Sequence, residues 1–286
     1  MLLVDDGSTD QTKKVIKPFL EDDRIRYFYQ ENEGQGSARN KAIDQAKGIY
    51  LALLDADDVW DEDRLQSQLN VMLQEEVSLV FSKFRRIASD GQFLNKYKGN
   101  GTGYYQGFSA FFLLAGGYFS IANSSVLVKK DSVESVGRFD ESEEARNIED
   151  YHLWFRMLLA GCTFFGTNDV LGAYRIHKNQ VTYNDSGQSP KIIAYLERLS
   201  MELPERKAFF QFLILRRLSM YYKQHNDKQK AKAICLRIYF SNECINSHPF
   251  EKYLINGLGL IAYFRFRRLY IRRFRRFKTF VGSARS

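Results

Sequence analysis

The residues best suited to chemistry form three acidic clusters beside predicted secondary structure. Asp55, Asp57 and Asp58 follow the apolar run 49–54. Three carboxylates in four residues repel one another unless a cation lies among them. The Asp-x-Asp spacing can direct two oxygens at one Mg²⁺ or Mn²⁺ ion, because both ions prefer oxygen ligands. The alternative is a solvated turn in which Asp57 or Asp58 caps the next helix.

The two other acidic clusters also adjoin predicted elements. The stretch VDDGSTD places Asp5 and Asp6 in a turn after the strand expected at residues 2–4, and Glu149 and Asp150 open a predicted helix. Asp5 can serve to stabilise its turn alone. Acids at a helix N-terminus are favoured by capping and by the helix dipole. Both clusters therefore need the context of the whole chain before a chemical role is assigned.

The elements that must position these residues alternate between strand and helix over the first 60 residues. The run 49–54 shows no alternation of polar and apolar residues, which is typical of a parallel strand covered on both faces. A βαβαβ order predicts an open α/β sheet, in which ligands bind beyond the carboxyl ends of the strands. The expected strands cover residues 2–4, 25–29 and 49–54, and the expected helices cover residues 11–20 and 38–47.

The rest of the chain continues the alternation and then becomes helical. Apolar and basic residues interleave with helical spacing from 190 to 241, and the polar stretch 184–190 marks a boundary. We therefore expect a domain at 1–188 and a helical C-terminal region at 189–286. Within the first domain, the pattern predicts helices at 61–76 and 148–160, strands at 77–87, 121–128 and 170–173, and a loop at 90–107.

The composition argues against several classes of protein. The chain is 44% hydrophobic and 27% charged, which are ordinary globular values and argue against wholesale disorder. Its three cysteines lie far apart without paired spacing. That spacing argues against a disulfide framework and a zinc site and fits a reducing compartment. The four histidines are scattered, which argues against a phosphohydrolase built on dense histidine ligands.

The basic character of the chain is concentrated at its C-terminus. Residues 251–286 hold ten basic residues and one acid, whereas the net charge of the whole chain is +8. Within 262–286, aromatic residues recur on one helical face between arginines, which is typical of a helix lying in an anionic membrane surface. The apolar run 254–264 is too short to span a bilayer, which needs about 20 residues. An RNA-binding arm and a solvated basic helix are the alternatives.

Six motifs in a fixed order carry a resemblance to a known family. They are VDDGSTD, NEGQGSARN, LLDADD, SSVLVKKDSVESVGRFDES, EDYHLWFRMLLAG and AYRIHKNQVT, and they span residues 4–182. Each motif alone is weak, but the six together resemble the inverting, metal-dependent glycosyltransferases of family 2. The resemblance covers nearly two thirds of the chain. It implies an α/β fold of the GT-A type, with an open mixed sheet and flanking helices.

The resemblance implies a binding site for a nucleotide-diphosphate sugar at the strand ends. Asp5 or Asp6 would accept hydrogen bonds from the base or the ribose, and we expect the other to stabilise the turn. Arg39 and Asn40 would face the same nucleotide or its phosphates, one helical turn in from a glycine-rich helix N-terminus. A surface arginine without a role is the alternative for Arg39.

The resemblance also implies a metal ion and a catalytic base. Asp57 would hold Mn²⁺ or Mg²⁺, Asp55 would lie against the ribose or the metal, and His177 would complete the metal's shell. The ion would neutralise charge on the leaving nucleotide. Asp150 would take a proton from the acceptor hydroxyl, and a single displacement inverts the anomeric configuration. A structural or exposed histidine is the alternative for His177.

The predicted function is transfer of a sugar from a nucleotide-diphosphate donor to a hydroxyl acceptor, in surface polysaccharide or glycolipid synthesis. Acceptors of such enzymes are often sugars linked to lipid. The basic segment 262–286 is therefore predicted to contact an anionic membrane surface rather than nucleic acid. This predicts a cytoplasmic protein that lies peripherally on the inner face of the cell membrane.

At its N-terminus the sequence departs from the pattern of the family. Family members begin with an apolar strand and a helix before VDDGSTD, and in their sheet that strand lies between those expected here at 2–4 and 49–54. Its absence would leave two rows of backbone groups unpaired. We expect a misassigned start, a truncated gene or an impaired fragment. The alternative function is an inactive remnant that at most binds the nucleotide-sugar.

Overall fold

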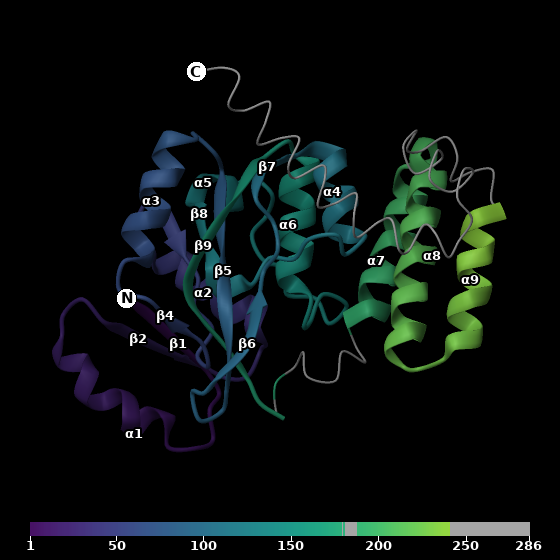
Figure 1. Cartoon of the computed structure of the whole chain (residues 1–286). Coiled ribbons are helices and arrows are strands. Elements are labelled where there is room, and N and C mark those ends of the chain that lie inside the picture. Colours follow the sequence, from purple (N-terminus) through teal and green to yellow (C-terminus); the bar gives the residue numbers. More distant parts are fainter. Residues whose placement is uncertain (179, 181–187, 241–286) are drawn as a thin grey trace. The chain divides into compact units, whose positions relative to one another are not determined.

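The computed structural model describes residues 1–178, 180 and 188–240 (Figure 1). The chain divides into two compact units, Met1–Ile192 and Ile193–Ser286. The strands are β1 (Leu2–Asp6), β2 (Arg26–Gln30), β3 (Tyr50–Ala52), β4 (Val59–Trp60), β5 (Leu79–Ala88), β6 (Phe93–Lys98), β7 (Gly103–Gln106), β8 (Val126–Lys129) and β9 (Thr163–Ile176). The α-helices are α1 (Thr12–Ile16), α2 (Gln35–Gln45), α3 (Arg64–Gln74), α4 (Gly107–Ala115), α5 (Lys130–Glu134), α6 (Glu149–Leu159), α7 (Gln188–Glu202), α8 (Lys207–Gln224) and α9 (Lys228–Phe240). The 3₁₀ turns in the described part of the chain are η1 (Lys17–Glu21), η2 (Asn123–Ser125) and η3 (Pro204–Arg206).

The described residues of the first unit form two sheets. β1 and β2 form a parallel pair, with Leu3 opposite Tyr27. The second sheet has seven strands in the order β3-β8-β5-β9-β4, with β6 on β5 and β7 on β9. β5 and β9 run parallel, and the other pairs in this sheet are antiparallel. The predicted mixed sheet with flanking helices is therefore confirmed.

The predicted βαβαβ sheet is wrong at its third strand. β3 does not join β1 and β2; it pairs antiparallel with β8, with Leu51 opposite Val128. The ladder covers three residues, Tyr50–Ala52, and only Leu51 of these is buried. The apolar run was interpreted as a strand covered on both faces. In the structure this strand is only partly covered, and its partner is β8, which lies about 75 residues further along the chain.

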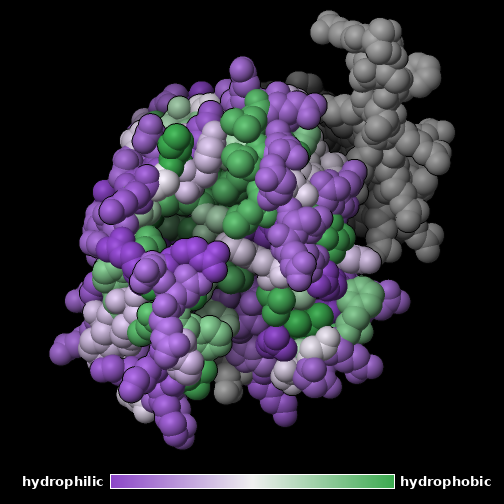
Figure 2. Space-filling view, turned by 90° about the vertical axis from the view of Figure 1, so that its left-hand side faces the viewer, coloured by the Kyte–Doolittle hydropathy of each residue, from purple (hydrophilic) through white to green (hydrophobic). Residues whose placement is uncertain are grey.

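β1 has one strand partner among the described residues, so its second edge is unpaired there. Its apolar residues Leu2, Leu3 and Val4 are only half-buried, and Ile49, just before β3, is 74% exposed. The side of the unit that carries β1 and α3 is seen face on in Figure 2, where apolar surface lines a hollow between polar ridges. This part of the molecule therefore covers its apolar residues incompletely.

The predicted loop at 90–107 is also wrong, because it contains β6 and β7. β6 pairs with β5 and β7 with β9, and Tyr104 of β7 packs edge to face on Phe165 at 5.0 Å between ring centroids. Glycines and tyrosines in this segment suggested a loop. Tyrosine nevertheless has a high strand propensity wherever a neighbouring edge is available.

One part of the core of the first unit lies between the larger sheet and α6, and another is the cluster of Met72 of α3 with Val77, Val80 and Leu127. Trp154 of α6 is 1% exposed and packs edge to face against Phe139 and Phe164. Trp154 is thus a core residue of the first unit. Because α6 begins at Glu149, this packing fixes the position of the predicted acidic pair.

Gly172 of β9 lies very close to β4 and to the Phe84 ring of β5. An added Cβ would lie 2.5 Å from the Phe84 ring and 2.6 Å from the Val59 carbonyl oxygen. Gly172→Ala is therefore expected to lower the free energy of unfolding by about 1–3 kcal/mol, as overpacking does in other cores. Urea denaturation followed by circular dichroism measures this change. An unchanged midpoint would contradict the close packing of β4 on β9.

In the second unit, α8 and α9 pack against each other. The first unit ends at Ile192, four residues after the boundary that was predicted at residue 188. Among the described helices, none is both long and apolar enough to cross a membrane. The basic segment predicted to contact membranes, 262–286, lies outside the described residues.

Candidate active site

Asp55 follows β3 and is held from two sides. Its Oδ1 accepts hydrogen bonds from Arg39 Nη2 at 2.8 Å and from Asn123 Nδ2 at 2.9 Å, and its backbone N–H donates to Ser124 Oγ at 3.0 Å. Asn123 and Ser124 lie in η2, just before β8, so the pairing of β3 with β8 brings them to Asp55. Sequence reasoning missed Asn123, because nothing local links it to a carboxylate 68 residues away.

Asp57 and His177 lie together, as the predicted metal ligands would. His177 Nε2 is 2.9 Å from Asp57 Oδ2. The pairing of β4 with β9 brings them together, since Val59 lies opposite Ala173. Arg175 supports the same turn by donating from Nε to the Asp57 carbonyl oxygen at 2.9 Å.

Asp58 points into the protein rather than toward a ligand. It is 8% exposed, and its Oδ1 accepts the Arg175 backbone N–H at 3.0 Å. Burial raises the pKa of Asp58 to about 6, and the charges of Asp57 and Asp55 add to the rise. The N-cap position of α3 is Asp63, so neither Asp57 nor Asp58 caps that helix.

Glu149 and Asp150 begin α6, and Arg39 links them to Asp55. Arg39 Nη1 donates to Glu149 Oε1 at 2.6 Å while its Nη2 donates to Asp55. Burial and the negative charge of Glu149 raise the pKa of Asp150 to about 7, although the positive charge of Arg39 opposes the rise. Asp150 is thus a carboxyl group poised to exchange a proton near neutral pH.

Asp5 and Asp6 both have partners within the protein. Asp5 accepts from the Ser8 backbone N–H at 2.8 Å and from the Tyr27 hydroxyl at 2.7 Å. Burial opposes ionisation of Asp5, but these hydrogen bonds outweigh it and hold its pKa below the usual value. Asp6 accepts from the backbone N–H groups of Glu33 and Gly34, each at 2.9 Å. Asp6 therefore fixes the turn that leads into α2.

Asn40 lies beside Arg39 on α2 but contacts a different part of the protein. Its amide exchanges two hydrogen bonds with the Phe139 backbone, at 2.9 and 3.0 Å, and donates a third to Glu141 Oε1 at 2.6 Å. The structure thus brings Arg39 to the acidic clusters and brings Asn40 to the loop before α6. The predicted nucleotide contact of Asn40 stays a prediction.

The donor groups of Asp55, Asp57 and His177 suit a hard divalent ion. Among residues 1–178, 180 and 188–240, no group of three or more His, Cys, Asp or Glu side chains is already arranged to hold a metal. The second oxygens of Asp55 and Asp57 have no protein partner in that part of the chain. Mg²⁺ and Mn²⁺ are commonly held by one or two carboxylates together with substrate phosphates, so this set fits an ion completed by a diphosphate.

Comparison with other proteins places the chain among sugar-transferring enzymes. TuaG of Bacillus subtilis, which carries the name of a teichuronic acid biosynthesis glycosyltransferase, is 31% identical over 186 residues, covering 64% of this chain and 70% of TuaG. The glucosyltransferase WfaP of Escherichia coli is 26% identical over 235 residues, covering 81% of this chain and 87% of WfaP.

Solved structures share the fold. TarS of S. aureus, in complex with UDP-GlcNAc, matches with a TM-score of 0.57 at 14% identity over 86% of this chain and 69% of that one. The mannosyltransferase PcManGT of Pyrobaculum calidifontis, in complex with GDP-Man and Mn²⁺, matches with a TM-score of 0.54 at 16% identity over 94% and 72%. The model of the family described as "Glycosyl transferase family 2" matches residues 1–137. The chain therefore belongs to glycosyl transferase family 2.

Proposed function

We propose that this chain transfers a sugar from a nucleotide-diphosphate donor to a hydroxyl acceptor, with inversion at the anomeric carbon. The observation that carries the proposal is the position of Arg39, which bridges Asp55 and Glu149. One guanidinium thus joins Asp55 of the predicted donor site to Glu149, the residue before the predicted base. A transfer reaction needs the donor site and the base close together, because the acceptor hydroxyl must reach the anomeric carbon while the donor is held.

Asp150 is proposed as the base. In its ionised form it would accept the proton of the acceptor hydroxyl as that oxygen bonds to the anomeric carbon. The bond from this carbon to the diphosphate oxygen breaks in the same step, and the nucleoside diphosphate leaves with the electron pair. A single displacement from the opposite face inverts the configuration.

Asp55, Asp57 and His177 are proposed to hold Mn²⁺ or Mg²⁺. When bound, the ion would neutralise negative charge on the diphosphate. Arg39 carries a fixed positive charge in the same region, and its carboxylate neighbours raise its pKa further despite burial. The nucleotide-sugar and Mn²⁺ present in the TarS and PcManGT structures support the choice of donor and ion.

The acceptor is proposed to be a sugar on a lipid carrier, in surface polysaccharide or glycolipid synthesis. The support is the names of the relatives: WfaP acts on a GlcNAc-diphosphoundecaprenol, and TuaG is named for teichuronic acid biosynthesis. Contact of 262–286 with an anionic membrane on the cytoplasmic side belongs to the same proposal. A lipid-linked acceptor would be presented at that surface.

The metal assignment is tested by Asp57→Ala. This change removes one carboxylate ligand and the partner of His177, so we expect Mn²⁺ affinity to fall by more than about tenfold, as loss of a supporting group alone costs about 10–100-fold. Titration of Mn²⁺ in the presence of UDP, followed by electron paramagnetic resonance, measures the affinity. Asp63→Ala removes an exposed carboxylate at the start of α3 and serves as the control. Equal Mn²⁺ affinity in both variants would refute the assignment.

The reaction itself is tested with nucleotide-sugars. A thermal-shift screen of UDP-Glc, UDP-GlcNAc and GDP-Man with Mn²⁺ identifies the donor, and release of the nucleoside diphosphate then reports turnover. Binding of a donor without any turnover on lipid-linked acceptors would favour the binding-only alternative. Failure of every nucleotide-sugar to bind would refute the proposed function.

A further inference from the structure

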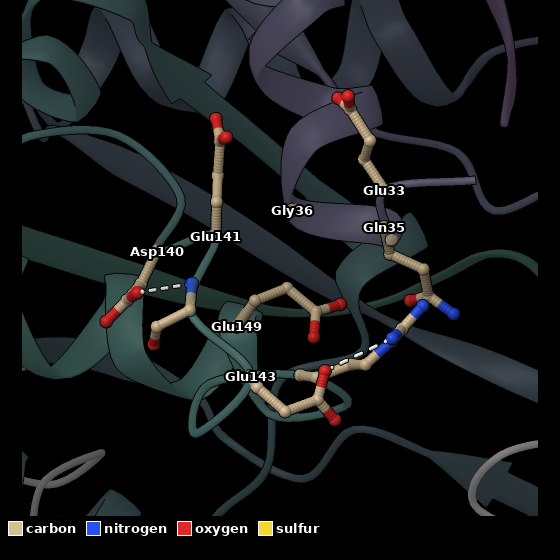
Figure 3. Close-up of a pocket in the computed structure, with 10 residues that line it drawn as sticks. Glu33, Gln35, Gly36, Asp140, Glu141, Glu143 and Glu149 are labelled. Atoms are coloured by element: carbon tan, nitrogen blue, oxygen red, sulfur yellow. Dashed lines mark hydrogen bonds and ion pairs between the residues drawn. The ribbon is translucent and has the colours of Figure 1, made fainter. Parts of the chain in front are cut away.

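A polar pocket lies between the N-terminus of α2 and the loop that leads into α6 (Figure 3). Residues 33–36, 140–143, 146 and 149 line it. Asp6 holds one wall through the turn before α2, and Asn40 holds the other through the Phe139 backbone. At Gly36 the walls approach so closely that an added Cβ would lie 2.8 Å from the Asp140 carbonyl oxygen. The pocket is therefore built by fixed contacts.

The lining of the pocket is rich in hydrogen-bond acceptors and negative charge. Five carboxylates and one guanidinium belong to it: Glu33, Asp140, Glu141, Glu143, Glu149 and Arg146. Arg146 pairs with Glu143 at 3.1 Å, so its positive charge is partly compensated. Ionised carboxylates only accept hydrogen bonds. The surplus of carboxylates therefore favours a ligand that donates hydrogen bonds and carries no negative charge.

Glu149 supplies an unmatched acceptor at the centre of this pocket. Its side chain reaches in from α6, and Figure 3 shows its carboxylate directed toward Gln35. The residue is 4% exposed, and Oε1 accepts from Arg39 at 2.6 Å. Its Oε2 is buried and has no hydrogen-bond partner among the described residues. A buried acceptor without a donor costs free energy, and a ligand hydroxyl would satisfy it.

We propose that this pocket is a subsite for an uncharged, hydroxyl-bearing acceptor sugar. The inference rests on the proposed function and adds to it the place and the charge of the acceptor. Glu149 immediately precedes Asp150 at the start of α6, so the pocket adjoins the residue proposed as the base. The surplus of carboxylates selects against an anionic sugar, because bringing like charges together is costly.

The test compares two sugars of the same shape and different charge on the full chain. Methyl β-D-glucopyranoside and methyl β-D-glucopyranosiduronate are titrated at pH 8 and followed by saturation-transfer NMR. We expect the glucuronide to bind at least about tenfold more weakly than the glucoside. The exposed double variant Glu33→Gln/Glu143→Gln removes two negative charges from the rim and is expected to reduce this discrimination to less than about threefold.

Glu149→Gln tests the central contact. It replaces one of the two carboxylate oxygens with an amide nitrogen and is expected to weaken glucoside binding about tenfold, within the range for a buried hydrogen bond. Glu62→Gln removes an exposed carboxylate outside the pocket and should change nothing. Thermal unfolding of each variant verifies folding, and the rim variant keeps the test valid if Glu149→Gln is unstable.

Equal binding of the two glycosides, a discrimination that the rim variant leaves unchanged, or a glucoside affinity that a folded Glu149→Gln variant leaves unchanged would each overturn the inference. So would the absence of any glucoside signal. Binding of UDP and of GDP with Mn²⁺ is measured on the same samples. Binding of either nucleotide without glucoside binding refutes the pocket and leaves the proposed function standing, whereas binding of neither nucleotide refutes the proposed function itself.

Discussion

Asp150→Asn is expected to lower kcat for sugar transfer by about 10³-fold, since general base catalysis contributes about 10²–10⁴-fold. Asparagine retains the shape of the side chain and the oxygen that accepts the Tyr151 backbone N–H at 2.7 Å. It cannot accept the acceptor's proton. Steady-state release of nucleoside diphosphate at pH 8 measures the loss, and donor KM is expected to stay within about twofold.

The pH dependence of the wild-type enzyme follows from the same carboxyl group. In the proposed mechanism only ionised Asp150 accepts the proton, and its pKa is raised to about 7 by burial and by Glu149. kcat is therefore expected to rise with pH up to about 7 and to level off above it. In Asp150→Asn this rise disappears. A pH profile that is unchanged in the variant would refute the assignment of Asp150.

Protein stability provides the control for this variant. The pKa of Asp150 is raised on folding from 3.8, so its ionisation destabilises the fold progressively between pH 3.8 and about 7, and fully above that. Asp150→Asn is therefore expected to be at least as stable as the wild type at pH 8. Asp131→Asn, which changes an exposed aspartate of α5, should alter neither activity nor unfolding.

Arg39→Met is expected to lower the free energy of unfolding by about 3 kcal/mol at pH 7.5. The change leaves Glu149, whose side chain is 5% exposed, without its cationic partner, and breaking a buried ion pair on one side costs about 3–5 kcal/mol. We expect the lower end of this energy range, because the Asp55 side chain is 33% exposed and water screens its ion pair with Arg39. Urea denaturation measures the change.

A double variant separates the ion pair from other effects of Arg39. Arg39→Met/Glu149→Gln removes the stranded charge as well, so it is expected to recover most of the lost stability. Arg24→Met removes an arginine whose side chain is 88% exposed in its pair with Asp22, and no shift of the midpoint is expected. If the double variant is no more stable than Arg39→Met, the unpaired charge of Glu149 is not the cause of the lost stability.

The order of the motifs was enough to predict the fold class. Local spacing made Asp55, Asp57 and Asp150 candidates, but only the resemblance to the family gave them the proposed roles, which stay predictions. The contact of Asp57 with His177 depends on β4 pairing with β9, which no local pattern shows. Asn123 was missed for the same reason, since it reaches Asp55 only through the pairing of β3 with β8.

Strand pairing also explains the errors in the fold. A run of apolar residues specifies a strand but not its partner, and β3 took an antiparallel neighbour that appears much later in the chain. β6 and β7 are short strands that depend on the edges of β5 and β9. The double role of α2 was equally hidden, since Arg39 and its neighbour Asn40 serve different parts of the site.

The separation of β1 and β2 from the larger sheet has a consequence for local unfolding. A two-stranded pair is marginally stable in water, and its register here is supported mainly by α2. The free energy of local opening is therefore expected to be lowest for this pair, so its amide protons exchange with solvent before those of the larger sheet. Asp6 is at the end of this pair and fixes the turn into α2, so opening of the pair also releases one wall of the pocket. A ligand that contacts this turn binds only the molecules in which the two strands are paired. Its apparent affinity is therefore reduced by the fraction of molecules in which the pair is open.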